Sequence, residues 1–368
     1  MRRCASHIST NPHIQRLSGD GCFEPQTTIA DGFMRPFAAI TPTFLRPSST
    51  STKDAGRAAD TTSKGYDDDS ISRINPLAQR ITRTPPRLIM RLARVAEGVP
   101  VLRRVFAAAY QRYFNGVRGH ARLFCGVYAD FATAACAIPV DGFQGYDNEP
   151  SAHRVSDDRF RIFPFDYPMM FWLGKLLPEC RRLFDWGGNV GISYFAYRKY
   201  LFYPAALEWL VSDVPAVVAA GREIALTETA PGLRFTETLD QLAHSDILLA
   251  AGVLHFIADP VAELRLQPAL PRHILLNKVP AYLLPSAVTL QNMGTAFCPN
   301  HLFNRDDLVR SFEKLGYELI DEWRAPNLSC HIPFFRQHSV PAYSGFYFRK
   351  PNNNAAPQLH ASLEVRDD

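Results

Sequence analysis

The segment from Arg182 to Gly191 constrains the fold most strongly, because it predicts a buried strand that ends on a carboxylate and turns through glycines into a helix. Its sequence is Arg-Leu-Phe-Asp-Trp-Gly-Gly-Asn-Val-Gly. An apolar run followed by turn residues is typical of a buried strand. Glycines let the backbone approach a ligand at the N-terminus of the following helix. The segment therefore predicts a nucleotide-type cofactor loop in an α/β fold.

The position of the acid in this loop indicates which cofactor it binds. A dinucleotide loop reads G-x-G-x-x-G, and its acidic residue follows about 20 residues later. Here Trp186 stands at the first glycine position and Asp185 directly precedes it. A pyrophosphate would face this uncompensated carboxylate, whereas a cationic cofactor would be attracted to it. S-adenosylmethionine carries an ammonium, a sulfonium and no phosphate, so we expect it as the cofactor in place of NAD.

A second apolar run, Leu207 to Asp213, also ends on a carboxylate. It lies at the distance where a mononucleotide-binding unit places its ribose-binding acid, so we expect Asp213 to hold a ribose. We expect further strands at 233–236, 246–251 and 273–278, helices at 192–202, 215–227 and 304–315, and two last strands at 317–323 and 343–348. Such alternation specifies a parallel sheet covered by helices on both faces.

The loop resembles the first motif, acid-x-G-x-G-x-G, of S-adenosylmethionine-dependent methyltransferases with the seven-stranded methyltransferase fold. Asp185, Gly187 and Gly191 match, and Asn189 replaces the middle glycine. Asn is the non-glycine residue best able to adopt a positive φ. The resemblance implies a Rossmann-like sheet whose last two strands form an antiparallel edge hairpin.

Two further segments carry the same resemblance. Asp213 to Val218 is similar to the Asp-Leu-Pro segment of small-molecule O-methyltransferases, which implies that Asp213 holds the ribose and Val214 lies along the adenine. Asp246 to Ile257 resembles the fourth motif, at whose carboxyl end ligands bind. The expected cofactor-binding residues are Asp185, Gly187, Gly188, Asn189, Gly191, Asp213, Val214 and Gly252.

The residues from Phe124 to Phe348 resemble, more closely, one subfamily of methyltransferases of unassigned substrate that is often associated with surface polysaccharide and glycan gene sets. The matching segments are 126–129, 145–147, 166–168, 185–188, 213–218, 288–292, 294–299 and 340–345. Their order along the globular part of the chain makes the resemblance specific. It implies no particular substrate.

Polar residues near the ends of the later strands are the candidates for chemistry on the acceptor. A polar residue at the His255 position is the general base in some O-methyltransferases; the alternative is a histidine that orients the acceptor or is satisfied within the domain. Adjacent amides suit the hydroxyls of a sugar. We therefore expect His255 as the catalytic residue and an acceptor held by Gln291, Asn292, His331 and Tyr343, in or beside irregular segments.

Composition divides the chain into a tail, a basic segment, a catalytic domain and a second tail. Residues 1–72 and 351–368 lack apolar periodicity and are expected to be disordered. The segment 73–118 contains a basic amphipathic stripe at 87–113, with Pro100 in its middle, ahead of a methyltransferase domain at 119–350. The stripe either packs on the domain, which we favour, or contacts an anionic membrane surface.

Charge and cysteine content limit partners and location. A net charge of +4 is too small to indicate nucleic acid. Seven scattered cysteines indicate reduced thiols, and hence a cytoplasmic protein that is at most peripheral at the inner membrane face. Adjacent Cys330 and His331 do not suit one tetrahedral ion together with Cys298 and His301, so no metal is expected.

The sequence thus predicts an S-adenosylmethionine-dependent methyltransferase that acts on oxygen of a glycan, sugar or other small-molecule acceptor. Two alternatives remain open at this point. One is an NAD-dependent sugar-modifying oxidoreductase, against which Asp185 and the missing first glycine argue. The other is a non-catalytic cofactor-binding or scaffold protein.

Replacement of Asp213 by alanine tests the ribose assignment. Asp213→Ala should weaken S-adenosylmethionine binding by about 1 to 3 kcal/mol, because charge-assisted hydrogen bonds to the ribose are lost. Titration calorimetry of the folded variant measures this change. An unchanged dissociation constant would remove Asp213 from the cofactor site.

Overall fold

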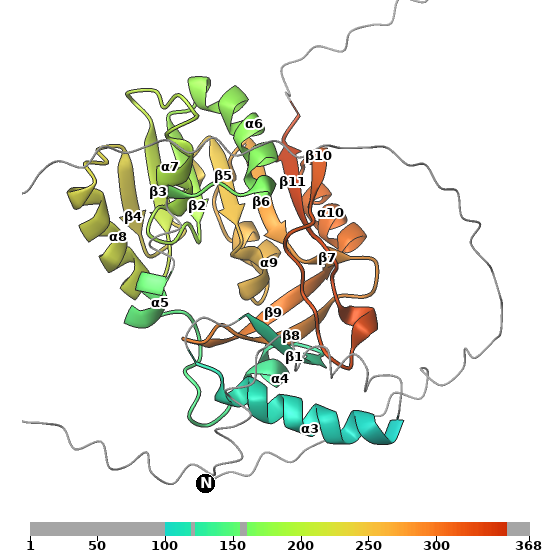
Figure 1. Cartoon of the computed structure of the whole chain (residues 1–368). Helices are drawn as coiled ribbons and strands as arrows, with labels where there is room; N and C mark the ends of the chain where they lie inside the picture. The colour runs from blue at the N-terminus through green and yellow to red at the C-terminus, as the bar shows by residue number, and fades with distance from the viewer. Residues whose placement is uncertain (1–99, 119–121, 155–159, 352–368) are drawn as a thin grey trace, which may run out of the picture. The chain divides into compact units, whose positions relative to one another are not determined.

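The main element of the structure is a seven-stranded sheet (Figure 1). This computed structural model describes residues 100–118, 122–154 and 160–351, all within one unit of the chain, Asp68–Asp368. The strands of the sheet are β2 (Arg182–Trp186), β3 (Glu208–Ser212), β4 (Leu233–Thr236), β5 (Ile247–Ala251), β6 (His273–Val279), β10 (Glu318–Ala325) and β11 (Tyr343–Arg349).

The strand order is β10-β11-β6-β5-β2-β3-β4. Neighbours from β4 to β6 are parallel, whereas β11 is antiparallel to β6 and β10 is antiparallel to β11. The last two strands therefore form the expected antiparallel hairpin at one edge. This arrangement confirms the predicted fold class, a Rossmann-like seven-stranded methyltransferase sheet.

Helices cover both faces of the sheet, and alternate residues of each strand point to opposite faces. Leu183, Trp209 and Leu249 pack in one buried cluster with α6 (Tyr167–Leu176) and α7 (Ile192–Tyr197). Their neighbours in the strands pack in a second cluster with α9 (Pro260–Arg265) and α10 (Arg305–Glu313). The remaining helices that bear on the site are α3 (Pro100–Gly116), α4 (Phe131–Cys136), α5 (Glu149–Arg154) and α8 (Pro215–Thr227).

Helix α7 is shorter than predicted, since it ends at Tyr197 and not at Phe202. The backbone N–H of Tyr200 donates to the carbonyl of Tyr197 at 2.8 Å, so the chain tightens into a turn. Pro204 follows shortly afterwards and restricts the residue before it to extended conformations, which disfavours a continued helix. The predicted bounds of α8 and β4 are confirmed.

A second sheet of four strands lies at the carboxyl ends of the parallel strands (Figure 1) and was not predicted. Its strands are β1 (Leu123–Tyr128), β7 (Ala281–Tyr282), β8 (Ala287–Asn292) and β9 (Phe297–Asn304). The order is β1-β8-β9-β7, with antiparallel pairing from β1 to β9. Strands β7 to β9 lie between β6 and α10 in the chain, so this sheet is largely an insertion into the methyltransferase fold.

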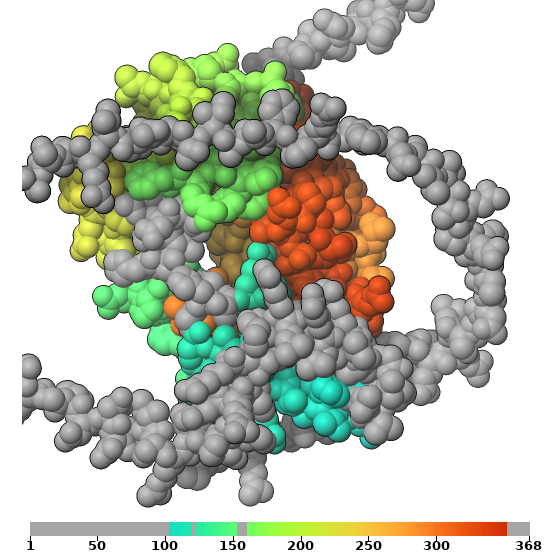
Figure 2. Space-filling view, viewed as in Figure 1, coloured from blue at the N-terminus to red at the C-terminus, as the bar shows by residue number. Residues whose placement is uncertain are grey.

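Helix α3 packs on the second sheet through Tyr110, Tyr113 and Phe114, which are buried with Leu290 and Phe297. The described part of the basic stripe is thus a packed helix, but Val105 of its apolar face is 65% exposed and Arg103 donates to the carbonyl of Phe334, so the expected division into a packed apolar face and arginines in solvent holds only in part. Residues 87–99 lie outside the described residues. Figure 2 shows part of α3, in cyan, at the molecular surface. None of the described helices combines the length and apolarity that a membrane span requires.

Asn292 joins α3 to the second sheet. Its Nδ2 donates to the carbonyls of Phe114 at 2.5 Å and Val117 at 3.1 Å, and its Oδ1 accepts the N–H of Gly294 at 2.6 Å. The side chain is 1% exposed. Asn292 therefore has a structural role, and its predicted role in acceptor binding is wrong.

Loss of this amide should destabilise the protein. Asn292→Ala should lower the free energy of unfolding by about 1 to 3 kcal/mol, because buried backbone groups lose their partners. Urea denaturation followed by circular dichroism measures the change. Gln291→Ala, on the opposite face of β8, is the control and should lower the free energy of unfolding by less. An equal decrease in the two variants would contradict this assignment.

Candidate functional site

The glycine loop after β2 adopts the backbone conformation that its sequence predicts. Gly187, Asn189 and Gly191 have positive φ values of 67°, 54° and 87°. A Cβ atom at Gly187 would lie 2.3 Å from the Cβ of Val253, so a side chain does not fit there. Asn189 therefore takes the place of the middle glycine in the left-handed region, as expected.

Asp185 lies beneath the loop and does not line the cavity. Its side chain is fully buried, and its Oδ2 accepts a hydrogen bond from Nε1 of Trp209 at 3.0 Å. A Cβ atom at Gly188 would lie 2.5 Å from the Asp185 Cγ, so the carboxyl occupies the space under that glycine. Burial raises the pKa of Asp185 to about 7. Its predicted direct contact with the cofactor is replaced by support of the loop.

Gly191 also lies outside the cavity wall. It precedes α7, and a Cβ atom there would meet Cδ2 of Leu233 at 2.8 Å. The glycine is needed for close packing of the turn on β4, and its contact with the cofactor stays a prediction. The other six predicted cofactor residues do line the cavity: Gly187, Gly188, Asn189, Asp213, Val214 and Gly252.

Asp213 fastens the glycine loop to the end of β3. Its Oδ2 accepts the backbone N–H of Asn189 at 2.9 Å, and its Oδ1 accepts that of Val214 at 2.8 Å. Burial raises the pKa of Asp213 to about 6, against the effect of these two hydrogen bonds. A carboxylate has about four lone-pair sites. Two acceptor positions therefore remain for hydroxyl groups of a ligand.

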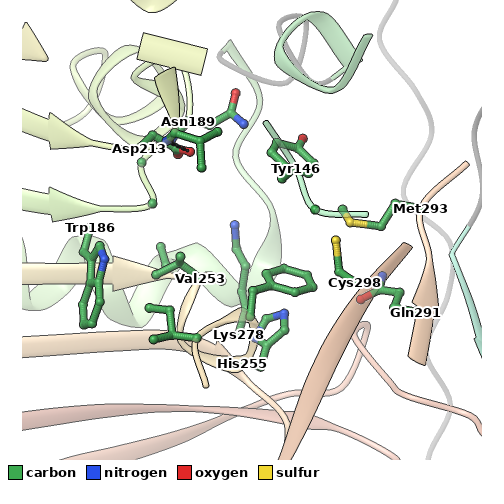
Figure 3. A pocket seen from close by; sticks show the side chains of 18 of the residues that line it. Tyr146, Trp186, Asn189, Asp213, Val253, His255, Lys278, Gln291, Met293 and Cys298 are labelled. Atoms are coloured by element: carbon green, nitrogen blue, oxygen red, sulfur yellow. Dashed lines mark hydrogen bonds between the residues drawn. The ribbon is translucent and has the colours of Figure 1, made fainter. Parts of the chain in front are cut away.

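A cavity of about 1010 Å³ opens between the glycine loop and the second sheet. The large sheet contributes the ends of β2, β3, β5 and β6, and the second sheet contributes Gln291 and Cys298, which are paired across β8 and β9. Tyr146, from the segment before α5, faces the same space (Figure 3). In open α/β sheets, ligands bind at the carboxyl ends of the strands. The described chain thus offers a closed-in site with a loop on one side and a β wall on the other.

His255 lines this cavity from the turn after β5. It is 6% exposed, and its ring packs 4.2 Å from the ring of Phe256, centroid to centroid. Burial lowers the pKa of His255 to about 3, with further lowering by Arg122, His301 and Lys278. Its Nδ1 has no hydrogen-bond partner among the described residues. His255 is therefore a neutral imidazole with capacity to accept a hydrogen bond.

Strand alternation separates the two predicted amides on β8. Gln291 lines the cavity, and its Oε1 accepts a hydrogen bond from Nδ2 of Asn300 at 2.8 Å. Asn292, the next residue, faces α3 as described above. Both lie at the end of β8, directly before the irregular turn 293–296, so the expected place beside an irregular segment is confirmed.

Tyr343 lines the cavity as predicted, and His331 does not. His331 lies between Cys330 and Ile332, which are fully buried in a cluster with Leu302 and Tyr343. This packing holds the segment against the sheet, whereas His331 itself is half-buried, and its contact with the acceptor stays a prediction. The structure also brings together no group of three His, Cys, Asp or Glu side chains suited to a metal ion within the described ranges.

Two cations in the cavity wall were missed by the sequence prediction. Lys278 directly follows Asn277 in β6, and Arg122 directly precedes β1. The position of Lys278 at the end of the fifth parallel strand is a signal that could have identified it. Arg122 carries no such signal, because the second sheet that places it was not predicted.

No family model matches the chain, and no curated protein matches it. Solved structures of methyltransferases do resemble it. A 1,6-didemethyltoxoflavin-N1-methyltransferase of Burkholderia thailandensis, with S-adenosylhomocysteine bound, shares 16% identity over 51% of this chain and 79% of that chain, with a TM-score of 0.36. The N-terminal domain of EvdMO1, with S-adenosylhomocysteine and D-fucose, shares 12% identity over 52% of this chain and 85% of that chain, with a TM-score of 0.37.

A magnesium protoporphyrin IX methyltransferase of Synechocystis, with S-adenosylhomocysteine bound, shares 16% identity over 56% of this chain and 90% of that chain, with a TM-score of 0.34. At these TM-scores the similarity carries no argument about this chain. The assignment of the fold to this chain rests on the strand order and directions given above.

The raised pKa of Asp213 predicts opposite pH dependences for ligand binding and stability. Affinity for the expected cofactor product, S-adenosylhomocysteine, should rise as pH increases through about 6, where the carboxyl becomes a charged acceptor. The folded pKa lies above the ordinary value of 3.8, so the contribution of this group to the stability of the unliganded protein should be lost as pH rises from about 4 to about 6.

Titration calorimetry and urea denaturation between about pH 4 and about pH 8 measure the two effects. Asp213→Asn is the matched control, since it cannot ionise and should remove this part of both pH dependences. An affinity profile that is the same in both proteins would assign the pH dependence to another group.

Proposed function

We propose that this protein is an S-adenosylmethionine-dependent methyltransferase. The observation that carries the proposal is the junction of the glycine loop with Asp213 at the rim of the cavity. There a carboxylate faces the space where a ribose would lie, next to backbone that approaches closely through Gly187 and Gly188. The loop lacks the first glycine of a dinucleotide site and has Asp185 beneath it, which disfavours a pyrophosphate.

We further propose that the acceptor is a glycan, a sugar or another small molecule, methylated on oxygen. A lone pair of the acceptor oxygen forms a bond to the methyl carbon while the carbon–sulfur bond breaks. The sulfonium becomes the neutral thioether of S-adenosylhomocysteine, and the hydroxyl proton leaves to a base. Alignment of the two reactants supplies much of the rate increase in such a displacement.

The residues beside the cavity suit particular roles in this reaction. Neutral His255 can accept a hydrogen bond from the acceptor hydroxyl and so orient it, and as a candidate base in the cavity wall it can receive the proton. Gln291 and Tyr343 line the same wall and can bind further hydroxyl groups of the acceptor. The location in the cytoplasm and a membrane contact through 87–113 remain predictions, as do the four segments into which composition divides the chain.

Parallel titrations of the full chain with S-adenosylmethionine, S-adenosylhomocysteine and NAD test the cofactor. We expect the first two to bind with micromolar dissociation constants, which correspond to a binding free energy of about −8 kcal/mol, and we expect no binding of NAD. Mass spectrometry of a panel of sugars incubated with S-adenosylmethionine then detects methyl transfer as a gain of one methylene.

The alternatives give different results in the same experiment. NAD binding without S-adenosylmethionine binding would indicate the oxidoreductase. Binding of S-adenosylmethionine without turnover over a broad acceptor panel would indicate the non-catalytic protein. If the folded chain bound none of the three ligands, the proposal would be refuted.

A further inference from the structure

The segment 143–148 forms a strap between the second sheet and α8. Its first half pairs with Phe297 in β9: the N–H of Phe297 donates to the carbonyl of Phe143 at 2.8 Å, and the N–H of Gly145 donates to the carbonyl of Phe297 at 3.1 Å. The strap is therefore held to the second sheet by its backbone. Three consecutive residues of the strap line the cavity: Gln144, Gly145 and Tyr146.

The second half of the strap is fastened to the N-terminus of α8. Oδ1 of Asp147 accepts the N–H of Ala216 at 2.9 Å. The first N–H groups of a helix have no partner within the helix, and a carboxylate beside them is favoured. Burial raises the pKa of Asp213, and the charge of Asp147 raises it further. Asp147 therefore lies near the acid that is expected to hold the ribose.

Helix α5, which follows the strap, fixes its exit. Oδ1 of Asn148 accepts the N–H of Ser151 at 2.9 Å, and Oγ of Ser151 donates to Oγ1 of Thr295, in the turn between β8 and β9, at 2.8 Å. Ser151 and Ala152 are buried, and Ala152 packs in one cluster with residues of α8. The strap is thus attached at β9, at the turn after β8 and at α8, so packing on both sides determines its position.

These attachments hold Tyr146 opposite the glycine loop. Figure 3 shows Tyr146 across the cavity from Asn189 and Asp213. Tyr146, Ile192 and Val214 pack against the same buried cluster, and all three line the cavity. They therefore offer an apolar surface next to the carboxylate of Asp213.

An adenosine is a flat ring system joined to a ribose, so it matches an apolar surface beside a carboxylate acceptor. Building on the proposed function, we propose that Tyr146 completes the adenosine part of the cofactor site and that Asp147 positions it there. The ring of Tyr146 packs against the adenosine that Asp213 and Val214 hold. Aromatic side chains stack on nucleobases because every base has a π-face.

Removal of the ring tests this contact in the full chain. Tyr146→Ala should weaken binding of S-adenosylhomocysteine about tenfold in titration calorimetry. Tyr146→Phe should change it less than about threefold, because the ring and not the hydroxyl makes the contact. The matched control is Phe143→Ala, since Phe143 lies on the same strap, is 52% exposed and does not line the cavity.

The control should bind as tightly as the unaltered chain. An unchanged affinity in folded Tyr146→Ala would overturn the proposal, as would an equal loss in Phe143→Ala. A loss in Tyr146→Phe as large as that in Tyr146→Ala would assign the contact to the hydroxyl and overturn the stacked ring. Thermal unfolding followed by circular dichroism verifies that each variant is folded at the temperature of the titration.

A shorter ligand identifies the part of the cofactor that the ring contacts. 5′-Methylthioadenosine keeps the adenosine and lacks the amino acid. Tyr146→Ala should weaken its binding by the same factor, about tenfold. A loss confined to S-adenosylhomocysteine would overturn the assignment to adenosine, as would an absence of 5′-methylthioadenosine binding by the unaltered chain at about 10 mM.

Variants of Asp147 test its positioning role. Asp147→Ala should weaken S-adenosylhomocysteine binding about fivefold, and Asp147→Asn should retain most of the affinity, because an amide oxygen can still accept the Ala216 N–H. In the Tyr146→Ala background, Asp147→Ala should have no further effect, since Asp147 acts through the ring. Additive losses in this double-mutant cycle would overturn the positioning role.

Asp141→Ala is the matched control for Asp147→Ala. Asp141 is an exposed acid in the loop before the strap, where it pairs with Arg118 at 3.3 Å, and it does not line the cavity. Its loss should leave binding unchanged, and a loss of affinity equal to that of Asp147→Ala would contradict the role of Asp147. Absence of S-adenosylhomocysteine binding by the unaltered chain would refute the proposed function itself, whereas normal binding that Tyr146→Ala leaves intact would overturn this inference alone.

Discussion

The turn from β2 into α7 depends on one buried carboxyl group. Asp185 fills the space below Gly188 and accepts a hydrogen bond from Trp209, which belongs to the neighbouring strand β3. Ionisation in that position is costly, since burial raises the pKa to about 7. The loop is thus built over a group whose charge the fold itself disfavours. A cationic ligand above the loop would offset that cost, whereas an anionic ligand would add to it.

A second constraint links the edge hairpin of the large sheet to Lys278. Gly345 in β11 has no room for a side chain, since a Cβ atom there would lie 2.1 Å from Cε2 of Trp323. Trp323 in turn donates to Asn277, whose amide fixes the backbone of Lys278. The edge hairpin, which is remote in sequence from the glycine loop, therefore determines where a cation enters the cavity. Packing at the edge of the sheet and electrostatics at the site are parts of one network.

The large sheet could be predicted because three of its parallel strands, β2, β3 and β5, are short apolar runs that end on or next to an acid or a glycine. The second sheet could not, since β8 contains Thr289, Gln291 and Asn292, polar residues that are buried only through pairing with β1 and contact with α3. The loop residues were found from local chemistry alone. The face of β8 that each amide occupies, and the presence of Lys278 and Arg122 in the wall of one cavity, depend on long-range contacts that no local pattern encodes.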